Sequence, residues 1–433
     1  MGSGASNQHT DHDPVNRINT SKIKQKAGRL SFGKVCFCIG ILLGLILIPS
    51  AYGCRNMPVQ EKKEPVAVMS GQADADSSPQ PVLVGRFRDE TNPGKDDAEE
   101  PDGSIDKQEK NFPQGYSMTT GKHLADTSAD RPVLAVIGNA PEVRPQTSLL
   151  LADLIYEFPL EKKNTETRFL AVFSHTLPDV CGPIVSARSY MIDLGAEWGS
   201  PLVINGYPDE PNYPELNTAD IVELSDASWK DKEFFFRDKT VTDNYDWSWF
   251  VRLRSLAQDA FTDDPAAVVH GRFLFEKGVS YSFGRSVAKV GIPFFGSDFK
   301  RIEFVYNQET NRFDRYEKNS KGKLVASKTR TPNEEGAGLH TEQVSVQNLI
   351  VQYVPYSYLY GDYRTADLLG NGKCEFFING RGFSGIWKHP SEKEPTQYLL
   401  NNQSEVTLEP GNTWIVIHPL DQEILITYRG SDY

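Results

Sequence analysis

The sequence predicts a two-domain α/β protein of the mixed α+β type, with a mixed sheet and helices in the first domain and a strand-rich second domain. Three observations lead to this class. Short apolar runs bounded by polar turns recur after residue 130, as expected for buried strands. Amphipathic helical patterns occur in the first half of that region. All six tryptophans lie after residue 190, and roughly 300 residues suffice for two domains.

The first domain is expected over residues 130–281. It opens with the apolar run VLAVIG from Val133, which suits a buried strand. Leu154 to Leu160 and Arg168 to Ser174 flank a polar stretch, an arrangement typical of two paired strands. A mixed sheet is therefore predicted at the start of this domain.

Two helices are expected in the same domain. Ser189 to Trp198 is the first. Trp247 to Ala260 has the stronger pattern, because its apolar residues recur at helical spacing on one face, namely Trp249, Phe250, Leu253, Leu256 and Ala257. Asp243 or Asp246 is available to cap it.

The second domain is expected over residues 282–433 and is rich in strands. Gly and Asn turns separate many of its apolar runs. The segments predicted to be extended are Phe299 to Tyr306, Val344 to Val354, Cys374 to Ile378, Trp414 to His418 and Ile424 to Tyr428.

Residues 1–54 have the character of an export signal. They carry six basic and two acidic residues, a net charge of +4, and the run from Val35 to Ile48 is wholly apolar. A basic stretch before such a run is typical of a secretory signal. The run ends shortly before Gly53 and Cys54, which resembles the lipidation site of a bacterial lipoprotein. The alternative is an uncleaved membrane span over residues 35–53. Both interpretations place the rest of the chain outside the membrane, with the lipid bilayer as a partner.

Residues 55–129 are interpreted as an acidic, disordered tether. They carry nine basic and fourteen acidic residues and only three aromatic ones. Such a segment buries too little apolar area to offset the entropy of ordering. It would hold the folded part away from the membrane.

Composition and motifs exclude several classes. The formal net charge of −12 argues against nucleic-acid binding, which needs a basic footprint. We find no sequence motif for a nucleotide, a cofactor, a metal or a catalytic serine, and the histidines are isolated. No cofactor or metal is therefore expected. Cys181 and Cys374 are the two thiols of the folded part, and a disulfide between them is left open.

A cluster of polar residues in the first domain is the candidate site. Several of these residues lie in or beside apolar segments, where a charged group needs partners. They comprise Arg144, Gln146, Glu157, Arg168, Ser186 and Arg188, with Asp238 further along the chain. Arginines in this setting can grip an anionic or carboxylate-bearing ligand through paired hydrogen bonds. The structural alternative is a set of salt bridges, for example between Glu157 and one arginine.

The same segments resemble a known group, the YerB-like bacterial lipoprotein family, described by a domain of unknown function (DUF3048) with its own C-terminal domain. RPVLAVIGNAPEVRPQTSLLLADLIYEF, TRFLAVFS and GPIVSARSYMIDLGAEW resemble its N-terminal signatures. NLIVQYV, GNGKCEFFINGRGFSGIWK and LEPGNTWIVIHP resemble its C-terminal ones. The resemblance implies a two-domain, lipid-anchored envelope protein and no particular reaction. Val185 stands where the family has a basic residue, and TVTDNYDW replaces a Pro-His-Asn segment after Asp238.

These observations favour a non-catalytic, lipid-anchored protein on the extracytoplasmic side of the cell membrane of a Gram-positive-type bacterium. Its role would be binding or assembly at the cell envelope, with an anionic envelope ligand or a membrane protein as partner. The alternative is a hydrolase of the cell wall or a polysaccharide, in which Glu157 pairs with Asp193 or Asp238 as acid and base. A purely structural partner of another membrane protein is the third interpretation.

Overall fold

The computed structural model describes residues 115–124, 131–160, 166–199, 201–205, 223–225, 234–260, 273–294, 297–333, 338–360, 363–392 and 394–430. All of them belong to one compact unit, Asp76–Tyr433. The predicted signal segment, Cys54 and residues 55–114 of the predicted tether lie outside the described residues. The domain boundaries therefore stay a prediction.

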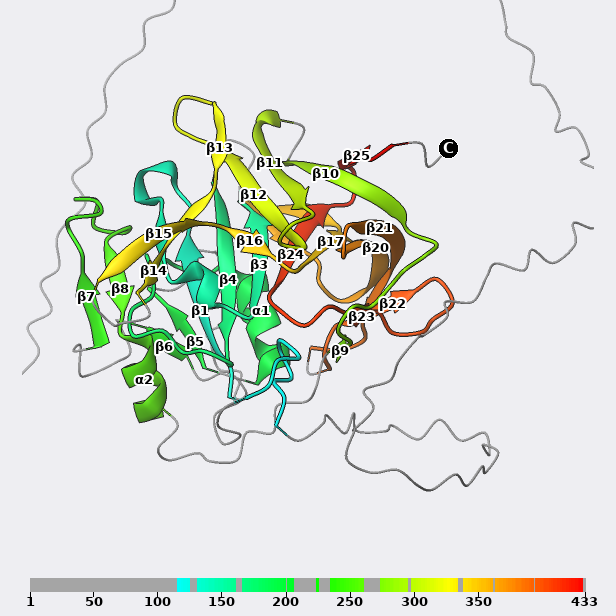
Figure 1. The fold of residues 1–433 in the computed structure, drawn as a ribbon. Coiled ribbons are helices and arrows are strands. Elements are labelled where there is room, and N and C mark those ends of the chain that lie inside the picture. The colour runs from blue at the N-terminus through cyan, green and yellow to red at the C-terminus, as the bar shows by residue number, and fades with distance from the viewer. Residues whose placement is uncertain are drawn as a thin grey trace, which may run out of the picture. The chain divides into compact units, whose positions relative to one another are not determined.

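The predicted fold class is wrong, because strands dominate both halves of the described chain. About 50% of the described residues are in strands and 10% in helices, and only two α-helices are present among them (Figure 1). The first half is not a balanced mixture of helices and sheet. Its apolar runs mostly form strands, which pair with one another and with strands of the second half.

The strands of the first half (residues 131–281) are mostly short. They are β1 (Val133–Gly138), β2 (Gln146–Thr147), β3 (Leu154–Pro159), β4 (Thr167–Phe173), β5 (Leu202–Ile204), β6 (Glu223–Ser225), β7 (Phe235–Arg237), β8 (Trp249–Val251) and β9 (Leu274–Phe275). Two short 3-10 helices occupy Pro141–Val143 and Leu149–Leu151. The predicted strand at Val133 and the predicted pair around Leu154 and Arg168 are confirmed, since β3 and β4 lie antiparallel.

The second half (residues 282–430) has the longer strands. Its first strands are β10 (Arg285–Phe294), β11 (Ser297–Asn307), β12 (Arg312–Lys318), β13 (Leu324–Ala326), β14 (Lys328–Pro332), β15 (Leu339–Gln343), β16 (Ser345–Val346) and β17 (Asn348–Val354). The remaining strands are β18 (Tyr356–Tyr360), β19 (Tyr363–Ala366), β20 (Gly370–Ile378), β21 (Arg381–His389), β22 (Gln397–Leu400), β23 (Thr407–Leu408), β24 (Thr413–Pro419) and β25 (Leu425–Tyr428). Each segment predicted to be extended in this half lies mainly in one of these strands.

One sheet runs through both halves. Its path is β13-β12-β11-β10-β21-β20-β17-β24-β3-β4-β1-β5-β6, with β16, β22 and β25 paired to the side (Figure 1). Strand β24 is parallel to β17 on one side and to β3 on the other. Strand β24, near the end of the chain, thus connects the strands of the second half to those of the first half within one sheet.

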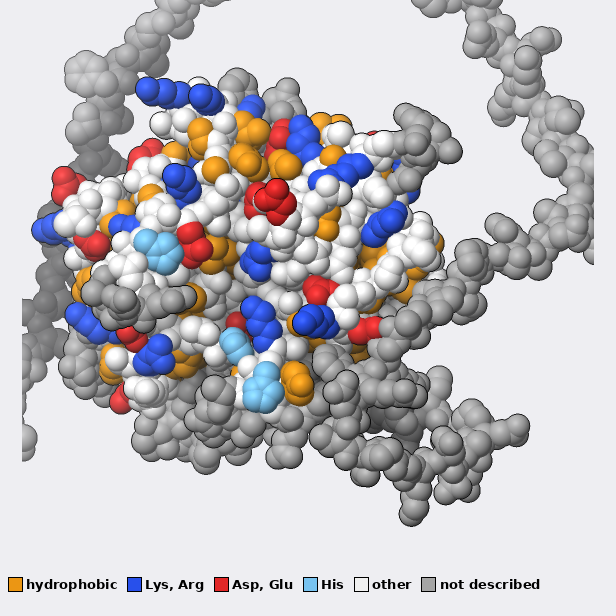
Figure 2. Space-filling view, viewed as in Figure 1, with side chains coloured by type: hydrophobic (Ala, Val, Ile, Leu, Met, Phe, Trp, Pro, Cys, Tyr) orange, Lys and Arg blue, Asp and Glu red, His pale blue; other side chains and the backbone are white. Residues whose placement is uncertain are grey.

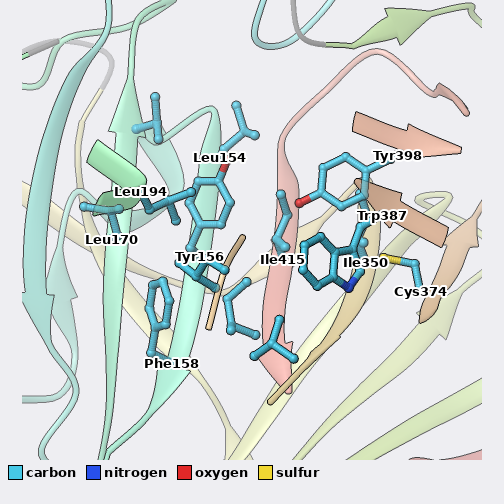
Figure 3. Packing of buried hydrophobic residues seen from close by; sticks show 14 of the residues in the cluster. Leu154, Tyr156, Phe158, Leu170, Leu194, Ile350, Cys374, Trp387, Tyr398 and Ile415 are labelled. Atoms are coloured by element: carbon cyan, nitrogen blue, oxygen red, sulfur yellow. The ribbon is translucent and has the colours of Figure 1, made fainter. Parts of the chain in front are cut away.

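Both faces of the central strands are packed with apolar side chains. Leu154, Tyr156 and Phe158 of β3 contribute to one core, which also holds Ile415 and Trp387 (Figure 3). Ile155 of β3 and Trp414 of β24 belong to the core on the opposite face. Strands buried on both faces read as continuous apolar runs rather than as alternation, which is why these strands were predictable from the sequence.

The two α-helices cover opposite faces of this sheet. Helix α1 (Ser189–Trp198) coincides with the predicted helix and packs into the core that contains Tyr156. Helix α2 (Leu253–Ala260) is shorter than predicted. Residues Trp249–Val251, expected in that helix, instead form β8, which pairs with β7. Pairing with a neighbouring strand thus overrides the helical pattern at the start of this segment.

The described residues 115–124 lie at the end of the predicted tether and contact the folded part. Thr119 donates from Oγ1 to Asp153 Oδ2 at 2.5 Å, and the amide of Gly411 donates to the carbonyl of Thr120 at 2.8 Å. No helix in the described ranges has the length and apolar character to cross a bilayer. On the face drawn in Figure 2, acidic and basic side chains are intermixed.

Candidate functional site

The central sheet separates the predicted site residues. In the β3–β4 pair, Glu157 lies opposite Phe169, whereas Phe158 lies opposite Arg168. Because successive side chains of a strand point to opposite faces, Glu157 and Arg168 belong to different faces. Arg144 and Gln146 connect to the Glu157 face, while Ser186 and Arg188 lie with Arg168. The structure thus divides the predicted cluster into two groups.

Glu157 is the centre of a buried network. The Arg315 guanidinium donates from Nη2 to Oε1 at 2.6 Å and from Nε to Oε2 at 3.3 Å. Thr167 Oγ1 donates to Oε1 at 2.8 Å, and Trp414 Nε1 donates to Oε2 at 2.9 Å. The Glu157 side chain is 0% exposed. Both carboxylate oxygens are therefore engaged within the protein, from strands of both halves.

Arg315 is held on its other side by a second carboxylate. Its Nη1 lies 3.0 Å from Glu317 Oε2 and donates to Ser327 Oγ at 2.7 Å. Burial alone would lower the pKa of Arg315, but the charges of Glu157 and Glu317 outweigh burial and raise it. Its guanidinium also lies 5.0 Å from the ring of Trp414. The arginine stays charged between its two acidic partners.

Glu317 links this network to Arg144. Arg144 Nε lies 3.4 Å from Glu317 Oε2, and Asn139 Nδ2 donates to the same oxygen at 3.3 Å. Burial alone would raise the pKa of Glu317, but Arg315 and Arg144 outweigh it, so this pKa is lowered. Gln146 Nε2 donates to Asn139 Oδ1 at 2.7 Å and orients that amide. Two predicted site residues, Arg144 and Gln146, therefore contact partners of this network, Glu317 and Asn139, rather than Glu157 itself.

The Arg144 guanidinium is fixed by backbone as well as side-chain acceptors. It donates from Nη1 to the carbonyl of Lys318 at 2.8 Å, from Nη2 to the carbonyl of Asn139 at 2.8 Å and from Nε to Asn139 Oδ1 at 3.0 Å. Burial lowers the pKa of Arg144, and the nearby Glu317 opposes that change. A guanidinium held at three points is oriented before any ligand arrives.

A pocket opens beside Arg144. It has a volume of about 240 Å³. The loop around Arg144 forms one wall, and the segment from β12 to β14 forms the other. Its lining residues are Pro141, Arg144, Pro145, Glu317, Asn319, Ser320, Val325, Ala326 and Lys328. This pocket combines charged, polar and apolar groups, which is the composition of small-molecule sites.

The second group lies on the opposite face of the sheet. Arg168 Nη1 donates to the carbonyl of Ser186 at 2.5 Å and to its Oγ at 3.2 Å. Arg188 is buried at the start of α1, with its guanidinium 5.0 Å from the ring centre of Tyr363. These contacts join β4, the segment before α1 and β19. They hold these elements together.

Asp238 belongs to neither group. It lies half-buried just after β7, where its Oδ1 accepts hydrogen bonds from the Thr240 amide at 2.9 Å and the Thr240 hydroxyl at 2.5 Å. Its charge acts on Arg330, whose pKa is lowered chiefly by burial. Asp193, the other carboxylate considered for an acid–base pair, is exposed on α1.

The sequence reasoning missed Arg315, Glu317, Trp414 and Lys328. A signal for the first two exists in β12, where the buried positions are Phe313, Arg315 and Glu317. Charged residues that lie two or four positions from a buried phenylalanine in a strand point to the same face as that phenylalanine, here the core. Buried charged residues need partners, so this spacing indicated that Arg315 and Glu317 belong to an ion-pair network.

The two cysteines of the folded part are free. Cys181 belongs to the core on the Glu157 side of the sheet, and Cys374 belongs to the core on the other side. Burial raises the pKa of each thiol. The disulfide left open by the sequence therefore does not form. In the described ranges no three His, Cys, Asp or Glu side chains are arranged to hold a metal ion.

Fold and site together define a strand-dominated protein whose halves share one sheet and one buried charge network, with a pocket of mixed apolar and charged lining beside that network. The description "Protein of unknown function (DUF3048) N-terminal domain" matches residues 119–264, and the corresponding C-terminal domain matches residues 291–415. The chain belongs to the DUF3048 family, as the sequence resemblance indicated.

Two comparisons with one Bacillus subtilis protein agree with this membership. "Putative lipoprotein YerB" of Bacillus subtilis (strain 168) is 26% identical over 293 residues, which is 67% of this chain and 81% of YerB. The crystal structure of YerB matches with a TM-score of 0.58 and 23% identity, covering 72% of this chain and 99% of that one. The structural match supports the fold alone.

Proposed function

We propose that the chain is a lipid-anchored extracytoplasmic protein that binds an anionic ligand of the bacterial cell envelope without catalysis. The observation that carries the binding role is the pocket that Arg144 and Lys328 both line, with the Arg144 guanidinium fixed by hydrogen bonds. Arginine and lysine together attract a carboxylate, and arginine sets its orientation. The membrane role is supported by the basic and apolar export segment that ends at Cys54 and by the name of the relative YerB.

The state of Glu157 supports binding over hydrolysis. A carboxylate that acts as acid or base must reach the substrate directly or through one water. Both oxygens of Glu157 instead accept hydrogen bonds from Arg315, Thr167 and Trp414. Asp193 is exposed and Asp238 is half-buried, whereas Glu157 is enclosed. This arrangement fits an ion pair that holds the fold together.

The binding role is tested with soluble cell-wall fragments released by a muramidase. We expect the purified full chain to retain anionic fragments and to return them with unchanged masses. The Lys328→Gln variant should retain them roughly tenfold less, since one charge-assisted contact is lost. Lys321→Gln, an exposed lysine in the turn between β12 and β13 and outside the pocket lining, is the matched control. Cleaved fragments would establish the hydrolase alternative, and no retention would remove the pocket as a ligand site.

The anchor is tested separately by labelling cells with radioactive palmitate. We expect the wild-type chain to take up label and Cys54→Ala to take up none. An unlabelled wild-type chain that still sediments with membranes would instead support an uncleaved span over residues 35–53.

A further inference from the structure

Glu317 leaves one carboxylate oxygen for the pocket. Its Oε2 receives Arg315 Nη1 at 3.0 Å, Asn139 Nδ2 at 3.3 Å and Arg144 Nε at 3.4 Å. Among the residues that the structure describes, no donor contacts its Oε1. The Glu317 side chain lines the pocket and is 6% exposed. The pocket therefore presents a negatively charged hydrogen-bond acceptor as well as positively charged groups.

Arg144 keeps hydrogen-bond donors for a ligand. Nη1 and Nη2 carry two hydrogens each, and each donates one hydrogen bond, to Lys318 and to Asn139. No acceptor for the second hydrogen of either nitrogen occurs in the described ranges. The side chain is 16% exposed and lines the pocket, so an oxyanion can approach this edge of the guanidinium.

Lys328 and the apolar walls complete the arrangement. Lys328 is exposed at the start of β14 and adds a second cation to the lining. Pro145, Val325 and Ala326 supply apolar surface of modest size. A volume of about 240 Å³ is below the roughly 300–1,000 Å³ typical of pockets for drug-sized ligands. The pocket suits a small molecule or a small end group.

We infer that the ligand of this pocket is a zwitterion of the amino-acid type, with a carboxylate held by Arg144 and Lys328 and an ammonium held by Glu317 Oε1. The inference rests on the proposed binding role and narrows its ligand class. A simple anion would leave Glu317 facing the ligand's negative end, which costs affinity by like-charge repulsion. A small side chain on the ligand would contact the apolar walls. The same group occurs in a free amino acid and at the free end of a diamino dicarboxylic acid residue in an envelope peptide, where one ammonium and one carboxylate stay outside the peptide bonds.

The test is calorimetric titration of the full chain with four matched small probes. L-Alanine and D-alanine carry both charges, N-acetylalanine carries only the carboxylate, and alanine amide carries only the ammonium. We expect an alanine enantiomer to bind at least roughly tenfold more tightly than either singly charged probe, because each charge-assisted contact contributes about that factor. Competition by the bound enantiomer against the cell-wall fragments then distinguishes a peptide end group from a free amino acid.

Two variants assign the contacts. Glu317→Gln should abolish the preference of alanine over N-acetylalanine while leaving N-acetylalanine binding equal or stronger, because the repulsion is gone. Lys328→Gln should weaken both probes, and Lys321→Gln should change neither. Melting temperatures confirm that each variant is folded.

Equal affinity for alanine and N-acetylalanine in the wild-type chain would overturn the proposal of a zwitterionic ligand and leave the proposal of anion binding intact. Binding of none of the probes or cell-wall fragments would remove the proposed binding role itself. An unchanged preference in folded Glu317→Gln would also overturn the assignment of the ammonium to Glu317.

Discussion

Glu157 and Glu317 contact the same arginine from two sides, yet their surroundings differ. Glu157 is 0% exposed, and both of its oxygens accept hydrogen bonds from the protein. Glu317 offers only Oε2 to the protein's own donors within the described ranges, and it lines a pocket. Both residues are glutamates and both contact Arg315. Their roles therefore differ in one respect, which is whether the second carboxylate oxygen has a partner within the protein. A satisfied carboxylate is structural, whereas a half-satisfied one beside a pocket is open to a ligand.

The largest expected effect is that of removing the enclosed carboxylate, Glu157. Glu157→Ala leaves the buried Arg315 without its bidentate partner, and removing one member of a buried pair typically costs about 3–5 kcal/mol. We expect the free energy of unfolding in urea to fall by that amount. Glu309→Ala, at an exposed position, is the control and should change it by less than about 0.5 kcal/mol. A loss below about 1 kcal/mol for Glu157→Ala would mean that the network does not stabilise the fold.

Much of the strand content could be predicted, and the reason lies in burial. Runs such as Val133–Gly138 and Asn348–Val354 are buried along their whole length, so every residue had to be apolar or paired. The strand at Trp249–Val251 could not be predicted. Its apolar residues also fit a helical face, and only the pairing of Phe235 with Val251 in space decides the matter.

The partner of Glu157 was also beyond the sequence. The structural alternative paired Glu157 with one arginine of the same cluster, which comprises Arg144, Arg168 and Arg188. The actual partner, Arg315, is 158 positions away. It is brought near because β24 joins β3 to the second half. Pattern and spacing describe one strand at a time, whereas sheet order decides which strands meet.

A smaller effect is expected at Glu317 and depends on pH. Its pKa is lowered in the folded chain, with its burial outweighed by Arg315 and Arg144. A lowered folded pKa means that the stabilisation is complete above the unfolded value of about 4.3 and is lost as the pH falls through the folded value. We expect Glu317→Gln to reduce unfolding free energy by about 1–3 kcal/mol near pH 7. That difference should shrink as the pH falls below about 4.3.

The measurement is urea unfolding of both chains from neutral pH down to about pH 3. A gap between wild type and Glu317→Gln that stays constant over this range would show that the Glu317 charge does not contribute. A gap that widens toward low pH would reverse the sign of the pKa shift.

The smallest effect is expected for an ion pair of similar distance on the surface. Arg254 Nε lies 2.7 Å from Asp179 Oδ1, and their side chains are 49% and 80% exposed. Exposed pairs typically contribute about 0–1 kcal/mol, because water and salt screen the charges. Asp179→Asn should therefore lower the unfolding free energy by less than about 1 kcal/mol, and 1 M salt should remove most of that loss. A loss near that of Glu157→Ala would contradict the view that enclosure, rather than a short distance, makes the Arg315 pair structural.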